Sequence, residues 1–200
     1  MEDVLEVYSR PFNEKRPVIC MDEKPFQLLD EYLEPIPMSE HNHREKYDCE
    51  YIRKGSCSIF MFTEPLGGWR EAHALSRRTA VDWAHQVKWL VDEAYPDVEK
   101  IVLVMDNLNT HTTASLYKAF SPEEAFRISQ RLEIHYTPKH GSWLDIAEIE
   151  LSALTIQCLL NVRIPTLDDL NRILDAWSQN RNSTQKGVSW HFTTETARVK

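Results

Sequence analysis

The chain has 200 residues, of which 42% are hydrophobic, so it is long enough to bury the core of one ordinary domain. Its 31 acidic residues outnumber its 23 Lys and Arg residues and give a formal net charge of -8, which excludes an electrostatic grip on nucleic acid over the whole chain. The sequence has neither an apolar run long enough to cross a bilayer nor a signal-peptide pattern, so we expect one cytoplasmic domain over residues 1–200 without a membrane contact.

The first part of the chain predicts a strand, a loop and a β-hairpin. After an opening segment that is expected to be helical, Pro17 precedes the β-prone run Val18–Met21, which is predicted to end at Asp22. Residues 34–48 are polar and have no hydrophobic period, which indicates a loop. Two strands at residues 57–64 and 68–75 are then joined by the turn "PLGG", where paired glycines permit positive φ.

The second part predicts alternating helices and strands. Residues 79–95 have apolar residues at helical spacing, and the apolar run Ile101–Met105 predicts a strand buried on both faces, followed by Asp106. Helices are expected at residues 113–120, 122–131, 144–160 and 167–180, with Thr166 as the N-cap of the last; a strand is expected at 132–137 and a β-prone end after 187. This order is typical of an α/β domain with a mixed sheet.

Acidic residues follow two of the predicted strands. Ligand sites in open α/β sheets lie at the carboxyl ends of strands, so Asp22 and Asp106 face one crevice if their strands are neighbours. Either residue alone is also explained as the start of a turn or as a helix cap. A third acid would favour a functional site.

The predicted helix over residues 144–160 offers that third acid in Asp145, Glu148 or Glu150. Its buried face is expected to contain the apolar residues at three- and four-residue spacing, which are Ile146, Ile149, Ala153, Ile156 and Leu160. Glu148 and Glu150 flank this face on opposite sides, so periodicity does not choose between them. Three converging carboxylates would suit Mg²⁺ or Mn²⁺, and two such ions can support phosphoryl transfer.

Four segments in this order resemble the catalytic domain of DDE-type transposases, in the bacterial insertion-sequence branch of the mariner-like superfamily. They are "RPVICMDEKPFQLLDE", "IVLVMDNLNTHT", "LEIHYTPKHGSWLDIAEIELSAL" and "GVSWHFTTETARVK". The resemblance implies an RNase H-like fold and a two-metal site that cuts DNA at transposon ends and joins the freed 3′-OH to a target. It places the three metal-binding catalytic acids at Asp22, Asp106 and Glu148.

Two features depart from that family pattern. Asp145 stands where the family usually has Asn, three residues before the catalytic Glu. The family's N-terminal helix-turn-helix DNA-binding region is also expected to be absent from this chain. The implied partners are therefore DNA, a second copy of the chain in the active complex, and a separate helix-turn-helix polypeptide, with association to the nucleoid during activity.

Other polar residues near these motifs have simpler roles available. His111, Lys139 and His140 are candidate contacts to DNA phosphates, with ordinary loop hydrogen bonding as the alternative. The histidines and four cysteines lack the spacing typical of a zinc site, and the cysteines are expected to be reduced. Glu23 follows Asp22 and should point to the opposite face of the strand, into solvent or a salt bridge.

Three functions remain open on the sequence. The first is metal-dependent DNA strand cleavage and strand transfer by Asp22, Asp106 and Glu148. The second is a truncated transposase remnant that folds and dimerises but does not cut DNA. The third is an RNase H-like nuclease that recognises nucleic-acid structure and not transposon ends.

Overall fold

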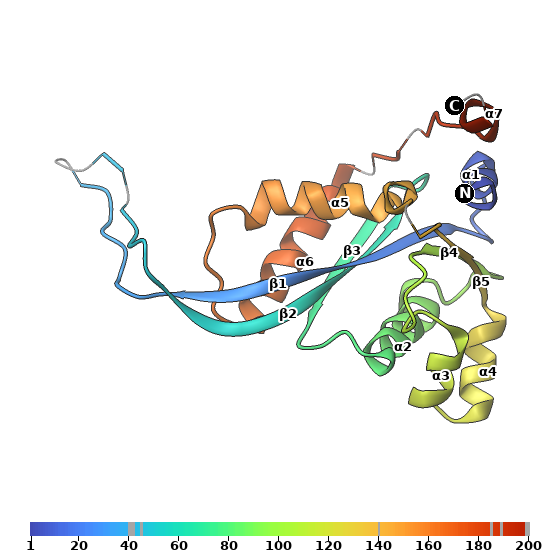
Figure 1. The fold of residues 1–200 in the computed structure, drawn as a ribbon, viewed down its shortest axis with the longest axis horizontal. Coiled ribbons are helices and arrows are strands. Elements are labelled where there is room, and N and C mark those ends of the chain that lie inside the picture. Colours follow the sequence, from blue (N-terminus) through green and yellow to red (C-terminus); the bar gives the residue numbers. More distant parts are fainter. Residues whose placement is uncertain (40–42, 45, 140, 185, 189, 199–200) are drawn as a thin grey trace.

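A five-stranded mixed sheet with the order β3-β2-β1-β4-β5 forms the centre of the protein (Figure 1). The computed structural model describes residues 1–39, 43–44, 46–139, 141–184, 186–188 and 190–198. The strands are β1 (Val18–Glu31), β2 (Tyr51–Glu64), β3 (Trp69–Leu75), β4 (Ile101–Met105) and β5 (Leu132–Tyr136). β1, β2 and β3 are antiparallel, whereas β1, β4 and β5 are parallel. The predicted mixed α/β sheet is therefore confirmed.

Helices cover both faces of this sheet (Figure 1). One face carries α2 (Ala80–Trp89), which continues as a π-helical turn at Leu90–Ala94, together with α3 (Thr113–Ala119) and α4 (Pro122–Gln130). The other face carries α5 (Ile146–Leu154), which follows a short 3₁₀ turn at Ser142–Leu144 and continues as a π-helical turn at Thr155–Leu159, and α6 (Leu167–Thr184). Near the termini, the short helices α1 (Glu2–Ser9) and α7 (Thr194–Arg198) lie beside one another. None of the helices in the described residues has the length and apolar composition needed to span a bilayer.

Alternation along the strands divides the core into two layers. In β1, Cys20 packs among the residues under α5 and α6, whereas Ile19 and Met21 pack among those under α2, α3 and α4. β4 alternates in the same way and is buried at every position, as its continuous apolar sequence predicted. Consecutive strand residues therefore serve opposite sides of the molecule.

β1 is longer than its sequence pattern suggested. It does not end at Asp22 but continues to Glu31. Its pairing with β4 ends at Met21, whereas its pairing with β2 continues to Glu31. Pro25 is tolerated there because a strand with only one neighbour can accommodate a residue that lacks an N–H. β1 and β2 project together from the body of the protein (Figure 1). In the described part of the connection, residues 34–48 form no helix or extended strand and include an isolated bridge between Ile36 and Lys46, in agreement with the predicted loop.

Local signals elsewhere in the sequence identified most elements. Residues 65–68 form the turn between β2 and β3, with Gly68 at φ 72°. Thr79 and Asp82 form a reciprocal capping box at the start of α2, and the Thr166 hydroxyl accepts a hydrogen bond from Asp169 N, as expected for an N-cap of α6. The β-prone C-terminal end was a wrong prediction, since α7 forms there.

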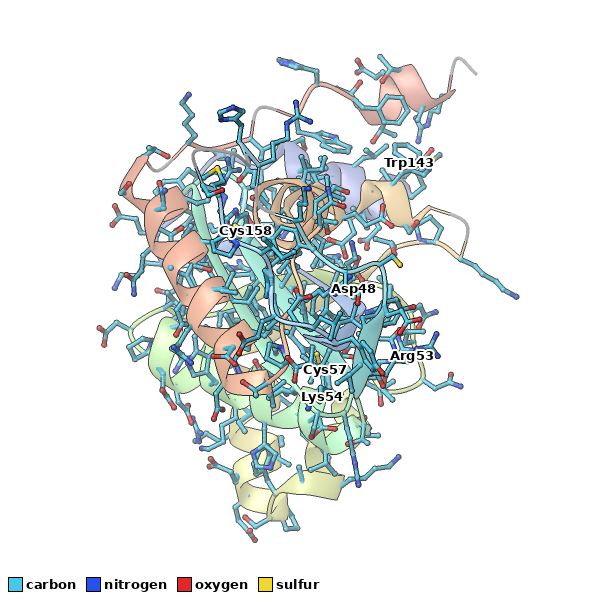
Figure 2. The ribbon with its side chains drawn as sticks, turned by 90° about the vertical axis from the view of Figure 1, so that its left-hand side faces the viewer. Asp48, Arg53, Lys54, Cys57, Trp143 and Cys158 are labelled. Carbon is cyan, nitrogen blue, oxygen red and sulfur yellow. The ribbon has the colours of Figure 1, made fainter. Side chains whose placement is uncertain are left out.

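The buried face predicted for the helix containing Glu148 is wrong for three of its five residues, whereas Ile146 is buried and Ala153 packs partly buried against the core, as predicted. Ile149, Ile156 and Leu160 are 51%, 70% and 57% exposed, and the neighbouring Trp143 is half-exposed (Figure 2). The buried residues of α5 are instead Ala147, Glu150, Leu151 and Leu154, together with Ile146 at its start. Apolar residues recur at helical spacing on both sides of this helix. The side that is buried also contains the charged Glu150, so hydrophobic spacing alone does not predict its burial.

A buried ion pair explains why Glu150 faces the core. Arg70 Nε on β3 and an Arg181 guanidinium nitrogen on α6 each lie 3.0 Å from the Glu150 carboxylate. The Glu150 and Arg70 side chains are each only 3% exposed. Arg70 also donates to the backbone oxygens of Gly68 and Lys186, so its charge remains hydrogen-bonded after burial. This cluster fixes which face of α5 packs on the sheet.

We predict that Glu150→Gln lowers the free energy of unfolding by about 3 kcal/mol, because it leaves Arg70 buried without its counter-charge. Glu148→Gln is the matched control, since it makes the same change two residues away on the same helix without breaking a described ion pair. Its effect should stay within about 0.5 kcal/mol or be stabilising. Urea denaturation of both variants measures the difference, and equal stabilities would contradict the role given to Glu150.

Candidate active site

Asp22 and Asp106 lie next to each other at the point where β1 and β4 separate. The parallel register pairs Val18 with Val102 and ends at the pair Met21 and Met105, so Asp22 within β1 and Asp106 just after β4 directly follow that last pair. Alternation in β1 directs the Asp22 side chain toward the face that carries α5, because Cys20 belongs to that layer, and the charge of the nearby Asp106 acts on Asp22. The expectation that the two strands are neighbours is correct, although Asp22 lies within β1 and not at its end.

Glu148 approaches the same position from α5. A groove of about 340 Å³ is lined by Asp22, Glu23, Lys24, Pro25, Glu148, Leu151 and Ser152. Glu148 lies in the first turn of α5 and is partly exposed, and its charge acts on Asp22. Glu150 is absent from this groove and binds Arg70 and Arg181 instead. Of the two glutamates that periodicity left equivalent, the structure places Glu148 beside Asp22.

Burial and neighbouring carboxylates perturb Asp22. The pKa of Asp22 is raised to about 6, mainly by burial and also by the charges of Asp106, Glu148 and Glu23, while a hydrogen bond from Glu23 N acts in the opposite direction. The site therefore concentrates negative charge around Asp22. Lys24 is the nearby cation of the groove, and its Nζ donates to Thr155 Oγ1 at 2.5 Å.

Asp145 serves as the N-cap of α5. Its Oδ1 accepts a hydrogen bond from Ala147 N at 3.0 Å, and within the described residues its buried Oδ2 has no hydrogen-bond partner. Complete burial, and next the charge of Asp22, raise the pKa of Asp145 well above its ordinary value. These effects favour the uncharged acid, which resembles the usual Asn of the family pattern in size and charge.

His111 connects Asp106 to Glu23. Its Nε2 lies 2.8 Å from Glu23 Oε1 and its Nδ1 lies 2.5 Å from Asp106 Oδ1. The imidazole has no exposed surface, whereas the Asp106 side chain is 31% exposed. Burial alone would lower the pKa of His111, but the two carboxylates outweigh this effect and raise it to about 9. Glu23 is therefore salt-bridged on the face opposite Asp22, as its place in the strand predicted.

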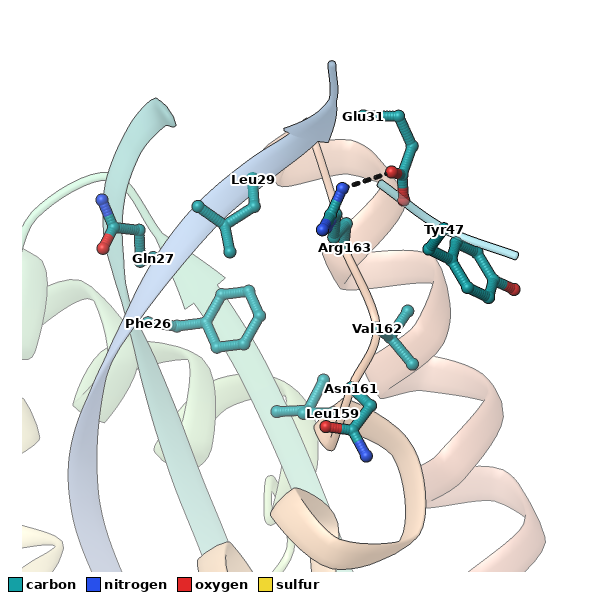
Figure 3. Close-up of a pocket in the computed structure, with 9 residues that line it drawn as sticks. All are labelled: Phe26, Gln27, Leu29, Glu31, Tyr47, Leu159, Asn161, Val162 and Arg163. Carbon is teal, nitrogen blue, oxygen red and sulfur yellow. Dashed lines mark hydrogen bonds and ion pairs between the residues drawn. The ribbon is translucent and has the colours of Figure 1, made fainter. Parts of the chain in front are cut away.

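The other candidate residues have different surroundings. Both ring nitrogens of His111 are engaged, so a phosphate contact by this side chain would require one of these interactions to break. Lys139 is exposed, and His140 lies outside the described residues. A larger cavity of about 790 Å³ lies between β1 and residues 159–163 and is partly closed by the ion pair of Arg163 with Glu31 (Figure 3). It contains none of the predicted catalytic acids.

The donor chemistry of the site fits a divalent cation. Carboxylate oxygens are the ligands preferred by Mg²⁺ and Mn²⁺, and the carboxylates of Asp106 and Glu148 lie near enough to Asp22 to raise its pKa. In those same residues, no group of three His, Cys, Asp or Glu side chains is gathered closely enough to enclose an ion. The acids therefore have an open arrangement. No zinc-like cluster is present among the described residues either.

The sequence of residues 17–171 matches the family model described as DDE superfamily endonuclease. The chain belongs to this family. The matched range contains Asp22, Asp106 and Glu148, and it includes every strand of the sheet. A comparison with curated proteins gave no match.

Solved structures of Mos1 mariner transposase have the same fold as this DDE superfamily endonuclease domain. The catalytic domain of Mos1 superposes with a TM-score of 0.56 at 14% identity, covering 88% of this chain and 76% of that one. The paired end complex with Mn gives 0.57 at 15% identity, with coverages of 88% and 52%, and the strand transfer complex gives 0.57 at 14%, with 88% and 51%. This chain thus spans about half the length of the Mos1 chains in those complexes. The sheet and its flanking helices are RNase H-like, as the sequence resemblance implied.

Two parts of the site were not evident from the sequence. The contact between Glu23 and His111 joins residues separated by 88 positions, and only the alternation of β1 suggested that Glu23 would need a partner of its own. No sequence signal linked Glu150 to Arg70, because both lie in segments whose other residues are apolar or ordinary surface residues. Tertiary packing creates both interactions.

We predict that metal-free protein loses stability as the pH rises from about 4 to about 7. The pKa of Asp22 is raised from 3.8 to about 6 in the folded state, so the folded protein binds more protons than the unfolded chain in this range. The sign of the linkage makes ionisation destabilising, by up to about 3 kcal/mol once the pH exceeds the folded pKa. Urea denaturation in EDTA should show that Asp22→Asn removes this part of the pH dependence. Parallel pH profiles for the two proteins would refute the prediction.

Proposed function

We propose that this chain is the catalytic domain of a transposase of the bacterial insertion-sequence branch, which cleaves DNA strands at transposon ends and transfers them to a target. The observation that carries the proposal is the approach of two further acids, from separate elements, to Asp22, whose pKa the charges of Asp106 and Glu148 both raise. Asp22 and Asp106 directly follow Met21 and Met105, the last pair in the parallel register of β1 and β4, and Glu148 lines the same groove as Asp22. Membership of the DDE superfamily endonuclease family supports phosphodiester chemistry at these acids.

Asp22, Asp106 and Glu148 would hold Mg²⁺ or Mn²⁺, most simply as a pair of ions. Such ions supply Lewis-acid stabilisation of the attacking and leaving oxygens in phosphoryl transfer. The protein's own contribution is positioning: β1 carries Asp22 on a paired strand, Asp106 directly follows β4, and the buried cluster around Glu150 holds α5 so that Glu148 lies in the groove beside Asp22. No protein nucleophile is required, because water or a DNA 3′-OH attacks the phosphorus.

DNA and a second copy of the chain are the proposed partners. The related Mos1 structures are a paired end complex and a strand transfer complex, which supports a role at DNA ends. The projecting β1–β2 arm exposes several large apolar side chains, which suits a protein contact: Tyr32, Leu33, Ile36, Met38 and Tyr47. Lys139 and His140 remain proposed phosphate contacts. A separate helix-turn-helix polypeptide would supply sequence recognition, and activity would take place at the nucleoid.

We expect Asp22→Asn, Asp106→Asn and Glu148→Gln each to reduce strand cleavage by more than about 100-fold. Each change removes a charged metal ligand, whereas residues that only support ligands typically contribute 10- to 100-fold. The measurement is Mn²⁺-dependent nicking and end joining on DNA that carries the cognate transposon ends, performed with the complete complex. Glu123→Gln, an exposed acid on α4, is the control and should retain activity.

The same assay distinguishes the alternatives. A folded wild-type protein that never cuts DNA with Mg²⁺ or Mn²⁺ would indicate a non-catalytic remnant, which the open arrangement of the acids also allows. Cleavage of RNA–DNA hybrids or junctions in preference to transposon ends would indicate a structure-selective nuclease. Undiminished cleavage in EDTA would exclude the metal-dependent mechanism altogether.

We also predict that this chain alone binds DNA weakly and without sequence preference. Its formal net charge of -8 opposes association with phosphates, and any local basic contact should be lost between about 50 and 200 mM salt. Gel-shift titrations with specific and scrambled DNA at both salt concentrations test this. Tight binding that survives at the higher concentration and discriminates between the two sequences would show that this domain reads DNA by itself.

A further inference from the structure

A histidine lies behind one of the proposed metal ligands and contacts a second carboxylate on the far side of its ring. His111 Nδ1 is 2.5 Å from Asp106 Oδ1, and His111 Nε2 is 2.8 Å from Glu23 Oε1. The His111 and Glu23 side chains are 0% and 2% exposed. Both are therefore inaccessible to DNA, and neither can act on a substrate directly.

The position of the imidazole is fixed on several sides. The Trp83 ring stacks against it, with 5.9 Å between centroids and an interplanar angle of 26°. Its backbone is held by the hydrogen bond from His111 N to Leu108 O and by the Tyr136 hydroxyl, which donates to His111 O. A ring held in this way offers Asp106 a partner at a constant place.

We propose that His111, held by Glu23, is a positioning residue that orients the Asp106 carboxylate for metal binding. The contact between His111 and Asp106 is a close ion pair and not an aligned hydrogen bond, and within the described residues neither atom hydrogen bonds elsewhere. Asp106 lies just beyond the last residue of β4, where sheet pairing no longer restrains the chain. Contact at Oδ1 leaves the other carboxylate oxygen for a metal ion. The proposal rests on the function proposed above, in which Asp106 is a ligand.

The arrangement matches a general feature of metal sites, in which groups behind the ligands hold them in orientation and affect affinity by about 10- to 100-fold. The usual order of the groups is reversed here, because the carboxylate would be the ligand and the histidine would support it. Glu23 then forms the outermost member and keeps the imidazole from turning away. The alternation of β1 explains how adjacent residues share one site from opposite faces: Asp22 as a ligand and Glu23 as support.

Two substitutions separate the contacts of His111. In His111→Gln, the amide nitrogen reaches approximately to the place of Nε2, so the contact with Glu23 is kept and that with Asp106 is lost. In His111→Asn, the shorter side chain places its amide nitrogen near Nδ1, so the contact with Asp106 is kept. His135→Gln is the matched control, because His135 also lies between two carboxylates, those of Asp3 and Glu133, but belongs to β5 outside the acidic groove.

The first experiment is Mn²⁺ binding by calorimetry, with thermal unfolding to verify that each protein is folded. His111→Gln should weaken binding about 10- to 100-fold, His111→Asn should recover most of the affinity, and His135→Gln should change it less than about 2-fold. In strand-cleavage assays, His111→Gln should raise the Mn²⁺ concentration needed for half-maximal rate. Wild-type affinity in His111→Gln would overturn the proposal, as would equal losses in the Gln and Asn variants.

The second experiment needs no metal. Crystal structures of the metal-free wild-type and His111→Gln proteins should show the Asp106 carboxylate turned away from its wild-type orientation in the variant. An unchanged orientation would overturn the positioning role, whatever the metal measurements give. If wild-type protein bound Mn²⁺ no better than Asp106→Asn, the proposed two-metal function would fail, while this structural comparison would still decide whether His111 orients Asp106.

Discussion

The buried ion pair between Glu150 and Arg70 determines which side of α5 packs on the sheet and therefore which glutamate lies beside Asp22. α5 has apolar side chains on more than one side, so hydrophobic burial alone does not select its packed face. Arg70 on β3, helped by Arg181 on α6, makes the face with Glu150 favourable to bury. Glu148 is then directed toward Asp22, whereas Ile149 and Ile156 are left exposed. One charged contact thus controls which of two glutamates can join the aspartates.

The sheet supplies the second constraint, through the exact alternation of its strands. Parallel pairing of β1 with β4 ends at Met21 and Met105 and so brings the next residues, Asp22 and Asp106, close together, and the two-residue period turns Glu23 to the face opposite Asp22. That face is covered by α2, and the Trp83 ring of this helix stacks on the buried imidazole of His111. The acids are consequently accessible on one side and supported from the other.

Electrostatics connect these two constraints with function. The raised pKa of Asp22, due first to burial and then to its acidic neighbours, reflects a site that is unfavourable while its carboxylates are ionised without a counter-ion. Asp145 avoids adding to this cost, because its own raised pKa favours the neutral acid at the cap of α5. The ionised carboxylates thus lower the stability of the folded protein, and the proposed divalent cation would offset that cost. Functional sites commonly reduce the stability of a protein in this way.

The sequence by itself determined the strands, most helices, and the positions of Asp22 and Asp106, because apolar periodicity, turn glycines and helix caps are local properties. It also supported the family, since four motifs in a fixed order do not depend on packing. Only the tertiary structure decided how far β1 extends, because its later pairing is with β2, and which stripe of α5 is buried, because Arg70 lies 80 positions from Glu150. The partnership of His111 with Glu23 likewise needed the fold. Periodicity measures hydrophobicity along one segment, whereas a buried charge is stabilised by a partner from another segment.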